Sequence, residues 1–327
     1  MTKSLEPSYL VTARNVYAEA AVEPARGLCC TSSPAWQLPG LTIPRRMLEM
    51  NYGCGNTVHP RDLANGPTVL YVGVGGGLEL LQFAYFTRRA GAVIGVDIVE
   101  EMLEACRSNL LEAERANAWF DPGFVDLRQG DALDLPLPDA SVGVAAQNCL
   151  FNIFHDAELR RALEEMYRVL EPRGRLILSD PICEEAIPDE LRADERLRAM
   201  CLTGAVPLRD YIGFLTELGF GTVEVRARRL YRVLSPRRYA TDRPIVIESV
   251  EICAIKDPMP ADGPCVFTGR AAIYSGDGSF DDGRGHVLMP NQPLAVCDKT
   301  AAAFARLSRD DLYVSEPTWF YDGGGCC

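Results

Sequence analysis

A short apolar segment that ends in glycines constrains this chain more than any other part of its sequence. Residues 69–72 are apolar, and four of the five residues 73–77 are glycines. Gly73 and Gly75 lack a Cβ, so the backbone can turn sharply and approach a ligand, and Gly77 lets a helix pack closely on the strand. The first turn of the following helix offers free N–H groups to the polar end of a ligand. The segment therefore predicts a strand, a tight turn and a helix that together bind a ligand.

Two acidic residues strengthen this interpretation. A second apolar strand at residues 92–96 ends in Asp97, about 20 residues after the last glycine, as expected for a carboxylate that accepts hydrogen bonds from ribose hydroxyls. Asp131 lies in a segment that resembles the acidic loop that Rossmann-fold methyltransferases place against the adenine of S-adenosylmethionine. These features predict an S-adenosylmethionine site formed by Gly73, Val74, Gly75, Gly77, Asp97, Ile98, Asp131, Ala132 and Asn148.

Charge and hydropathy argue against two classes of partner. The chain has 33 Lys and Arg against 45 Asp and Glu, a net charge of −12, and no basic run, so we expect no nucleic-acid partner. No apolar run approaches the roughly 20 residues that span a membrane. The first residues contain no apolar segment after Lys3, so we expect no secretory signal and a cytoplasmic location.

Alternating apolar runs and helical segments organise the middle of the chain. From residue 67 to about 180 the alternation is typical of a parallel sheet with crossover helices. We predict a doubly wound, Rossmann-like α/β fold of the class I methyltransferase type, with an N-terminal extension at 1–65, a core at 66–234 and a small α+β C-terminal domain at 235–327. Within the core, residues 181–207 are expected to form a cap insertion and residues 222–227 an edge strand.

Twelve cysteines are many for a chain without an export signal. In a reducing compartment cysteines are more often ligands, nucleophiles or core residues than disulfides. Cys149 follows the fourth expected strand, and Cys201 lies in the cap. Cys54 precedes the first strand on a turn whose flanking glycines are expected to expose its thiol. All three are predicted to meet at the carboxyl edge of the sheet. Cys106 and Cys253 are interpreted as packing thiols.

Three thiolates around one point suit a soft, thiophilic centre. Zinc competes, but structural zinc sites usually contain C-x₂-C pairs, and no such pair occurs in this chain. Trivalent arsenic held by three sulfurs keeps a lone pair that can attack a sulfonium methyl group, and this reaction needs no general base. His59, His155 and His286 are isolated in the sequence, which agrees with such a reaction.

Three cysteine segments, residues 51–55, 147–152 and 200–205, resemble the arsenic-binding motifs of arsenite S-adenosylmethionine methyltransferases. The adjacent Cys29 and Cys30 resemble the additional N-terminal cysteine of that family. Residues 295–300 and the Gly-Gly-Gly-Cys-Cys end are most similar to the subgroup of arsenosugar-biosynthesis arsenite methyltransferases.

This resemblance implies a set of roles. Cys54, Cys149 and Cys201 would hold arsenic, with arsenite and methylarsenite as substrates and S-adenosylmethionine as methyl donor. Cys29 or Cys30 would form a disulfide with a site cysteine and so return electrons to arsenic, and thioredoxin or glutathione would reduce that disulfide.

One residue departs from the pattern, and two rival functions stay open. Tyr71 stands where many methyltransferases have an acid two residues before the first glycine. The first rival is a methyltransferase that acts on a carbon or sulfur of a small organic molecule, with incidental cysteines. The second is a non-enzymatic, thiol-rich protein that binds zinc or a metalloid. For Cys326 and Cys327 at the end of the chain, we expect a role in metalloid delivery or thiol exchange.

Overall fold

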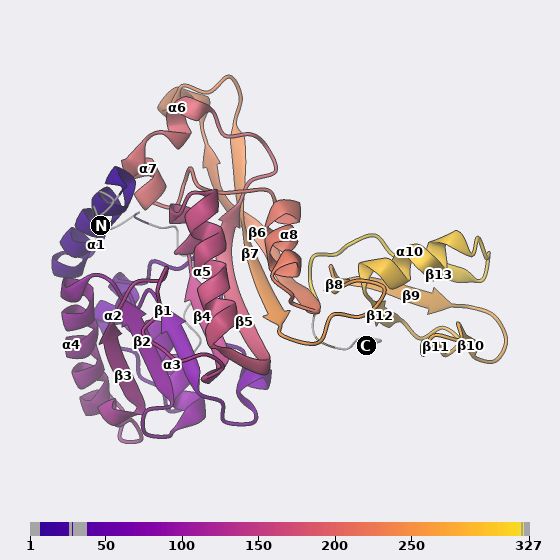
Figure 1. Ribbon diagram of the computed structural model, residues 1–327, viewed down its shortest axis with the longest axis horizontal. Helices are drawn as coiled ribbons and strands as arrows, with labels where there is room; N and C mark the ends of the chain where they lie inside the picture. The colour runs from indigo at the N-terminus through magenta and orange to yellow at the C-terminus, as the bar shows by residue number, and fades with distance from the viewer. Residues whose placement is uncertain (1–6, 26–27, 29–37, 322, 324–327) are drawn as a thin grey trace.

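The computed structural model describes residues 7–25, 28, 38–321 and 323. An eight-stranded sheet runs through the molecule in the order β3-β2-β1-β4-β5-β7-β6-β8 (Figure 1). The strands are β1 (Val69–Val72), β2 (Val93–Asp97), β3 (Val125–Gln129), β4 (Val142–Asn148), β5 (Leu170–Ile182), β6 (Thr222–Leu234), β7 (Ile245–Ile255) and β8 (Cys265–Phe267). The first five strands are parallel, and β7 is antiparallel to both β5 and β6.

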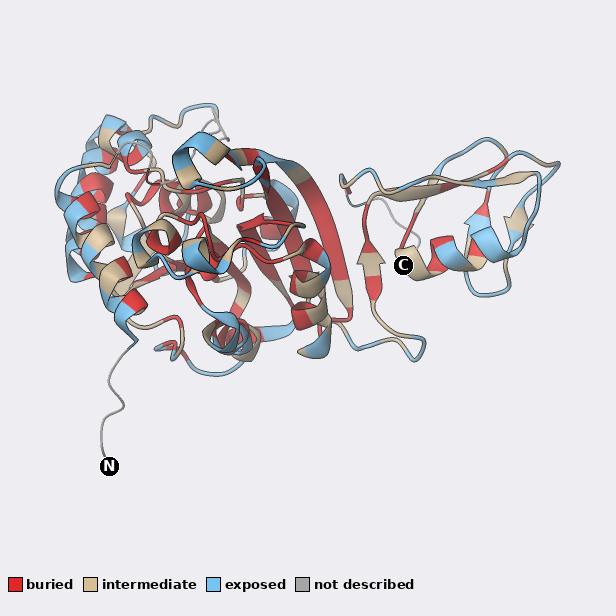
Figure 2. Cartoon of the chain, turned by 90° about the horizontal axis from the view of Figure 1, so that it is seen from above, coloured by how far each residue is buried: buried red, intermediate tan, exposed pale blue. Residues whose placement is uncertain are grey.

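Helices cover both faces of this sheet, as the predicted doubly wound fold requires. Helices α3 (Leu78–Thr87) and α4 (Glu100–Ala116) pack in one apolar cluster, and α5 (Asp156–Val169) and α8 (Leu208–Glu217) pack in another. Strand β1 contributes to both clusters, because alternate side chains of a strand point to opposite faces: Leu70 and Val72 join one cluster, Val69 and Tyr71 the other. Figure 2 shows the resulting buried sheet between more exposed helices.

Helices α4, α5 and α8 each bury one stripe of side chains, whereas α3 buries five consecutive residues, 80–84. In α5 the buried apolar residues are Leu159, Ala162, Leu163, Met166 and Val169, a spacing of three and four that places them on one face. Cys106 lies on the corresponding face of α4 and is buried, which agrees with its interpretation as a packing thiol.

The sheet continues beyond residue 234, where the sequence analysis expected a separate domain to begin. Residue 234 ends β6, and the chain returns through α9 (Pro236–Tyr239) into β7, which pairs along β6. The expected edge strand also differs, because β8 pairs with β6 at Thr222–Glu224. A separate C-terminal unit begins only after β8.

The C-terminal unit is a small α+β structure to one side of the main sheet (Figure 1). Strands β12 (Leu294–Val296), β9 (Arg270–Tyr274) and β13 (Leu312–Val314) form an antiparallel sheet that packs with α10 (Asp298–Arg306). A short hairpin of β10 (Phe280–Asp281) and β11 (Val287–Leu288) completes it.

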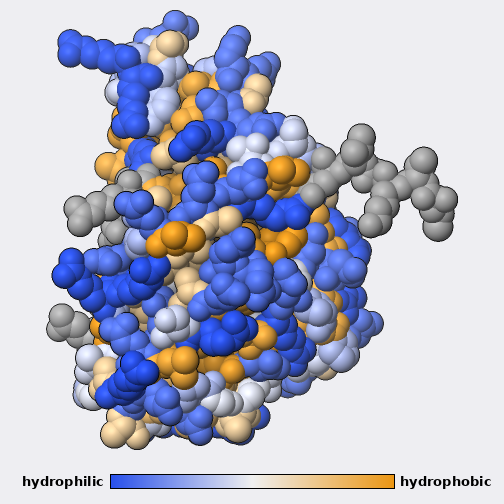
Figure 3. All heavy atoms as spheres, turned by 90° about the vertical axis from the view of Figure 1, so that its left-hand side faces the viewer, coloured by the Kyte–Doolittle hydropathy of each residue, from blue (hydrophilic) through white to orange (hydrophobic). Residues whose placement is uncertain are grey.

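The N-terminal helix and the cap lie near the carboxyl ends of the parallel strands. Helix α1 (Ser8–Val22) lies beside the cap helix α7 (Glu195–Ala199), with α6 (Asp189–Arg192) further along the cap and α2 (Arg45–Glu49) before the segment that carries Cys54 (Figure 1). The face that carries α1 is largely hydrophilic, with small apolar patches (Figure 3). No helix among the described residues is long and apolar enough to cross a membrane.

Candidate active site

The glycine turn after β1 has a backbone conformation that glycine adopts most easily. Gly73, Gly75 and Gly77 have φ angles of +81°, +51° and +87°, in the left-handed region. A Cβ on Gly77 would lie 2.8 Å from the sulfur of Cys106, so this glycine lets α4 approach the turn. Helix α3 begins directly afterwards. The predicted strand, turn and helix are therefore present.

Asp97 ends β2 and holds the glycine turn in place. Its Oδ2 accepts a hydrogen bond from the Val74 N–H at 2.9 Å, and its Oδ1 accepts one from the Val99 N–H at 2.9 Å. Burial raises the pKa of Asp97 to about 6, although both N–H groups favour the ionised form. Each carboxylate oxygen can accept a second hydrogen bond, so the carboxylate is still able to bind ribose hydroxyls.

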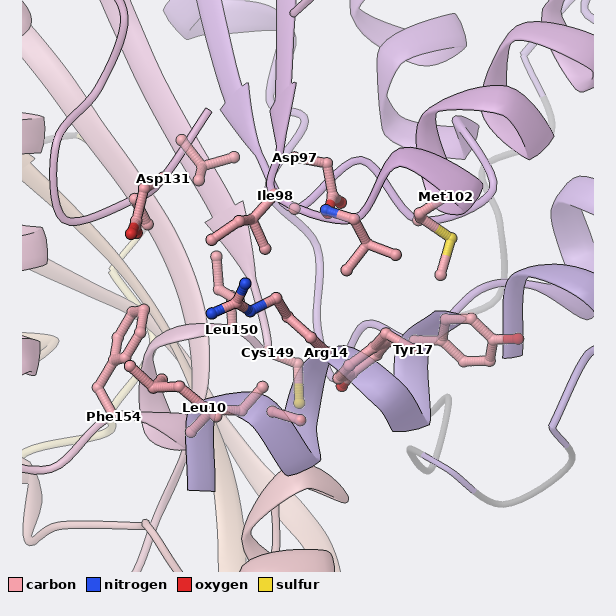
Figure 4. Close-up of a pocket in the computed structure, with 18 of the residues that line it drawn as sticks. Leu10, Arg14, Tyr17, Asp97, Ile98, Met102, Asp131, Cys149, Leu150 and Phe154 are labelled. Carbon is pink, nitrogen blue, oxygen red and sulfur yellow. The ribbon is translucent and has the colours of Figure 1, made fainter. Parts of the chain in front are cut away.

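A cavity opens at the carboxyl ends of β1, β2 and β4 (Figure 4). The residues predicted to bind S-adenosylmethionine that line it are Gly73, Gly75, Asp97, Ile98, Asp131, Ala132 and Asn148. Val74 and Gly77 are not lining residues, because one binds Asp97 and the other faces α4. Glycines at the turn and the carboxylate of Asp97 at the end of β2 are the groups that a nucleoside-containing cofactor requires.

Helix α1 forms a wall of this cavity that the sequence analysis did not assign. Leu10, Ala13, Arg14 and Tyr17 line the cavity, and Figure 4 shows α1 opposite Asp97 and Ile98. Their spacing of three and four residues places them on one face of the helix. The sequence contains this periodicity, but the partner of that face depends on the tertiary structure.

Glu79 is an acidic residue close to Tyr71, which occupies a position where many methyltransferases have an acid. The Glu79 carboxylate accepts a hydrogen bond from Asn148 Nδ2 at 3.0 Å and another from the Tyr71 hydroxyl. Burial raises the pKa of Glu79. A carboxylate therefore still lies next to the end of β1, on the first turn of α3. The sequence pattern did not indicate this residue, because Glu79 lies on the helix after the glycine turn and not on the strand before it.

The three predicted arsenic ligands come together in one buried cluster. Cys54, Cys149 and Cys201 expose 0%, 2% and 0% of their surface and share this cluster with Cys183. Cys149 follows β4 and also lines the cavity (Figure 4), so the cysteine cluster and the cavity share a boundary.

The thiols are not arranged as a finished ligand set. The Cys201 thiol donates to the carbonyl oxygen of Cys149 at 2.8 Å, and the sulfur of Cys54 lies 3.4 Å from the Ser179 hydroxyl. Within the described part of the chain, no three Cys, His, Asp or Glu side chains are grouped so that they could hold a metal ion. Cys149 and Cys201 also have φ angles of +63° and +58°. Such strain in non-glycine residues is concentrated at functional sites.

Asn148 joins the cavity to the segment that carries Cys54. Its Oδ1 accepts hydrogen bonds from the N–H groups of Cys54 at 2.8 Å and Gly55 at 3.4 Å, and its Nδ2 donates to the Gly55 carbonyl at 2.8 Å. A Cβ on Gly53 would lie 2.4 Å from Asn148 Nδ2. The glycines that flank Cys54 therefore allow this close contact. They do not leave the thiol on an exposed turn, as the sequence suggested.

Two buried polar groups support the same edge of the sheet. Asp180, on β5, accepts hydrogen bonds from Gln147 Nε2 at 2.6 Å and from the Tyr211 hydroxyl at 2.7 Å, and burial raises its pKa to about 7. Glu251, on β7, accepts one from the Asn56 N–H at 2.9 Å. These contacts anchor the ends of β4 and of the Cys54 segment.

The histidines lie apart from the cavity. His59 and His155 are absent from its lining residues, and burial lowers the pKa of both. His286 lies in the C-terminal unit, where its Nδ1 is 2.5 Å from Asp282 Oδ2. None of the three is positioned as a base for a group in the cavity.

Four cysteines with expected roles lie outside the described residues. They are Cys29, Cys30, Cys326 and Cys327. Their predicted roles, and the similarity to the arsenosugar-biosynthesis subgroup, stay predictions.

Two known proteins with similar sequences are arsenite methyltransferases. Residues 70–178 match the methyltransferase domain family. The chain is 34% identical over 177 residues to an arsenite methyltransferase of Halobacterium salinarum, covering 54% of this chain and 43% of the relative. It is 36% identical over 199 residues to an arsenite methyltransferase of Aquipseudomonas alcaligenes, covering 59% of this chain and 55% of the relative. The chain thus spans about half the length of these curated relatives.

A solved structure agrees at the level of the fold. An arsenic(III) S-adenosylmethionine methyltransferase from Chlamydomonas reinhardtii superposes with a TM-score of 0.59 at 23% identity, over 85% of this chain and 95% of that one. Together, the sheet order, the glycine turn with its cavity and the matched domain show that the chain has a class I methyltransferase fold, and over about half of its length it is similar to arsenite methyltransferases.

Proposed function

We propose that this chain transfers the methyl group of S-adenosylmethionine to trivalent arsenic that Cys54, Cys149 and Cys201 hold. The position of Cys149 carries the proposal, because this residue lines the donor cavity and also belongs to the buried cluster of Cys54 and Cys201. An acceptor bound to that cluster lies next to the donor. The names of the curated relatives support arsenite as the acceptor.

The chemistry of the residues fits this acceptor. Thiolates bind soft centres in preference to hard ones, and arsenite exchanges its hydroxyls for sulfurs with release of water. S-adenosylmethionine, when bound, supplies an electrophilic methyl group on a sulfonium. Arsenic bound to three sulfurs offers its own lone pair, so no proton has to be removed from the nucleophile. The absence of His59 and His155 from the cavity lining is consistent with this reaction.

The chain's own residues would orient both reactants. Asp97 would accept hydrogen bonds from the ribose hydroxyls, Asp131 would lie beside the adenine, and Asn148, which Glu79 holds by a hydrogen bond, would bind the amino-acid end of the donor. Arg14 and Tyr17 of α1 line the opposite wall of the cavity.

A thiol must return electrons after each transfer. Methylation raises the formal oxidation state of arsenic by two. A thiolate that attacks one arsenic-bound sulfur forms a disulfide, breaks that arsenic–sulfur bond and leaves both electrons on arsenic. We assign this role to Cys29 or Cys30, with thioredoxin or glutathione reducing the disulfide in the cytoplasm. A variant with both Cys29→Ser and Cys30→Ser should complete one turnover per enzyme and then stall. Unchanged multiple-turnover rates would refute the assignment.

The test of the function is arsenic speciation. Purified protein is incubated with S-adenosylmethionine, arsenite and excess thiol, and methylated arsenic is measured. The wild type should produce it and Cys149→Ser should not. Cys253→Ser is the matched control, because Cys253 is fully buried on β7 outside the cysteine cluster. If the wild type binds S-adenosylmethionine but makes no methylarsenical, an organic acceptor must replace arsenite.

A further inference from the structure

Helix α1 contacts the donor cavity and two of the three cysteine segments at once. Its side chains Leu10, Arg14 and Tyr17 line the cavity, and Figure 4 shows them along the wall nearest Cys149. Because one helix contacts both the cavity and the cysteine segments, α1 is a structural connection between the donor and the acceptor halves of the site.

One end of this connection reaches the cap that carries Cys201. The Thr12 hydroxyl donates to Glu195 Oε2 on α7 at 2.6 Å, and Ser8 hydrogen bonds to the other oxygen of the same carboxylate. The Tyr17 hydroxyl lies 3.3 Å from the Ala199 carbonyl oxygen and 3.8 Å from the sulfur of Cys201. Tyr17 therefore contacts both the cavity and a proposed arsenic ligand.

The other end of the connection reaches the segment that carries Cys54. The Tyr52 hydroxyl donates to the Ala20 carbonyl oxygen at 3.1 Å and accepts from the Ala25 N–H at 3.3 Å. A ligand that orders α1 from the cavity side thus orders the supports of both Cys54 and Cys201.

The present contacts of Cys201 show what must change when arsenic binds. Its thiol donates a proton to the Cys149 carbonyl oxygen. An arsenic-bound sulfur has lost that proton and can only accept hydrogen bonds. The single proton of the Tyr17 hydroxyl now points to the Ala199 carbonyl oxygen. Rotation of the O–H bond toward the sulfur of Cys201, 3.8 Å away, would stabilise Cys201 in its ligating form.

We propose that Tyr17 is a positioning residue that couples occupancy of the donor cavity to arsenite binding, through its contacts with the cavity and with Cys201. This proposal rests on the proposed function for the identity of the two ligands. Because coupling between two sites is reciprocal, each ligand must tighten the other by the same factor. We expect a factor of about five or more, the lower end of typical coupling between sites.

The experiment measures binding without turnover. The dissociation constant of arsenite is determined by calorimetry in the absence and presence of saturating S-adenosylhomocysteine, which has no methyl group to transfer. Tyr17→Phe keeps the ring and removes the hydroxyl. Tyr9→Phe is the matched control on the same helix, since the Tyr9 hydroxyl lies 3.5 Å from the His155 N–H and is not a lining group of the cavity.

The expected result is a coupling factor that falls toward one in Tyr17→Phe and stays at the wild-type value in Tyr9→Phe. The coupling factor is the ratio of two arsenite dissociation constants of the same variant, so a change in stability or in overall affinity cancels in it, which separates positioning from a general loss of structure. Equal coupling in Tyr17→Phe and the wild type would overturn the proposal, as would a wild-type factor of one. Failure of the wild type to bind arsenite at all would instead overturn the proposed function.

Discussion

Replacement of Asn148 by alanine tests whether the Cys54 segment is held for arsenic binding. The substitution removes two hydrogen bonds that the amide accepts, from Cys54 and Gly55, and two that it donates, to Gly55 and Glu79. A buried hydrogen bond contributes about 1 kcal/mol net, and an unsatisfied buried group costs about 1–3 kcal/mol. We therefore expect Asn148→Ala to lower the free energy of unfolding by about 2–4 kcal/mol.

Asn117 offers a matched control away from the site. Its buried amide accepts from the Thr42 N–H at 2.6 Å and donates to the carbonyls of Thr42 at 2.7 Å and Ala113 at 2.8 Å. Asn117→Ala thus removes a similar set of amide-to-backbone bonds from another segment. Both variants should lose similar stability in urea denaturation, because the bonds removed are alike.

Only Asn148→Ala should lose affinity for arsenite. If the position of Cys54 contributes about 1.4 kcal/mol to binding, its loss weakens arsenite about tenfold. The titration is made without S-adenosylmethionine, because Asn148 also lines the donor cavity. Wild-type arsenite affinity in Asn148→Ala, or equal weakening in Asn117→Ala, would refute the reasoning.

Three further predictions follow from the same contacts. The affinity for S-adenosylhomocysteine should rise with pH and level off above about 7, because Asp97, with a pKa of about 6, binds ribose hydroxyls best when ionised; calorimetry should give a flat profile for Asp97→Asn. The pKa of Asp180 is raised to about 7 from 3.8, so the folded state retains a proton that the unfolded chain releases. Stability should therefore fall by up to about 4 kcal/mol as pH rises from 4 to 7, and urea denaturation should find this slope reduced in Asp180→Asn. A Cβ on Gly204 would lie 1.6 Å from the Asn152 carbonyl oxygen, so Gly204→Ala should displace the cap and weaken arsenite binding. Gly213→Ala on α8 is its control: the added methyl group meets no atom within 4 Å and should raise stability by about 0.5–1 kcal/mol, whereas Gly204→Ala should lower it. Urea denaturation that gives the reverse order would contradict the packing argument.

Local sequence patterns predicted the strand ends and the glycine turn well. The glycine turn at residues 73–77 and the carboxylate of Asp97 lie where the sequence places them, because strand periodicity, turn geometry and the end of a strand are decided by neighbouring residues. The cysteine motifs likewise identified Cys54, Cys149 and Cys201, which do share one buried cluster.

Sequence patterns failed where long-range pairing decides the structure. The expected boundary at residue 234 lies inside a hairpin, because β7 inserts between β5 and β6 and its apolar side chains complete the core. The composition changes there, but composition does not report which strand a segment pairs with. The glycines beside Cys54 were interpreted as exposure, whereas they permit contact with Asn148.

The sequence by itself determined the fold class and the glycine turn, since the alternation of strands and helices and the geometry of the turn are decided by residues close together in the chain. Only the tertiary structure decided that α1 lines the cavity, that Glu79 lies near the end of β1, and that Asn148 and Tyr17 contact both the cavity and the cysteine segments. These contacts join residues far apart in sequence. Their geometry arises from the packing of the whole sheet, helices and cap, which no local pattern contains.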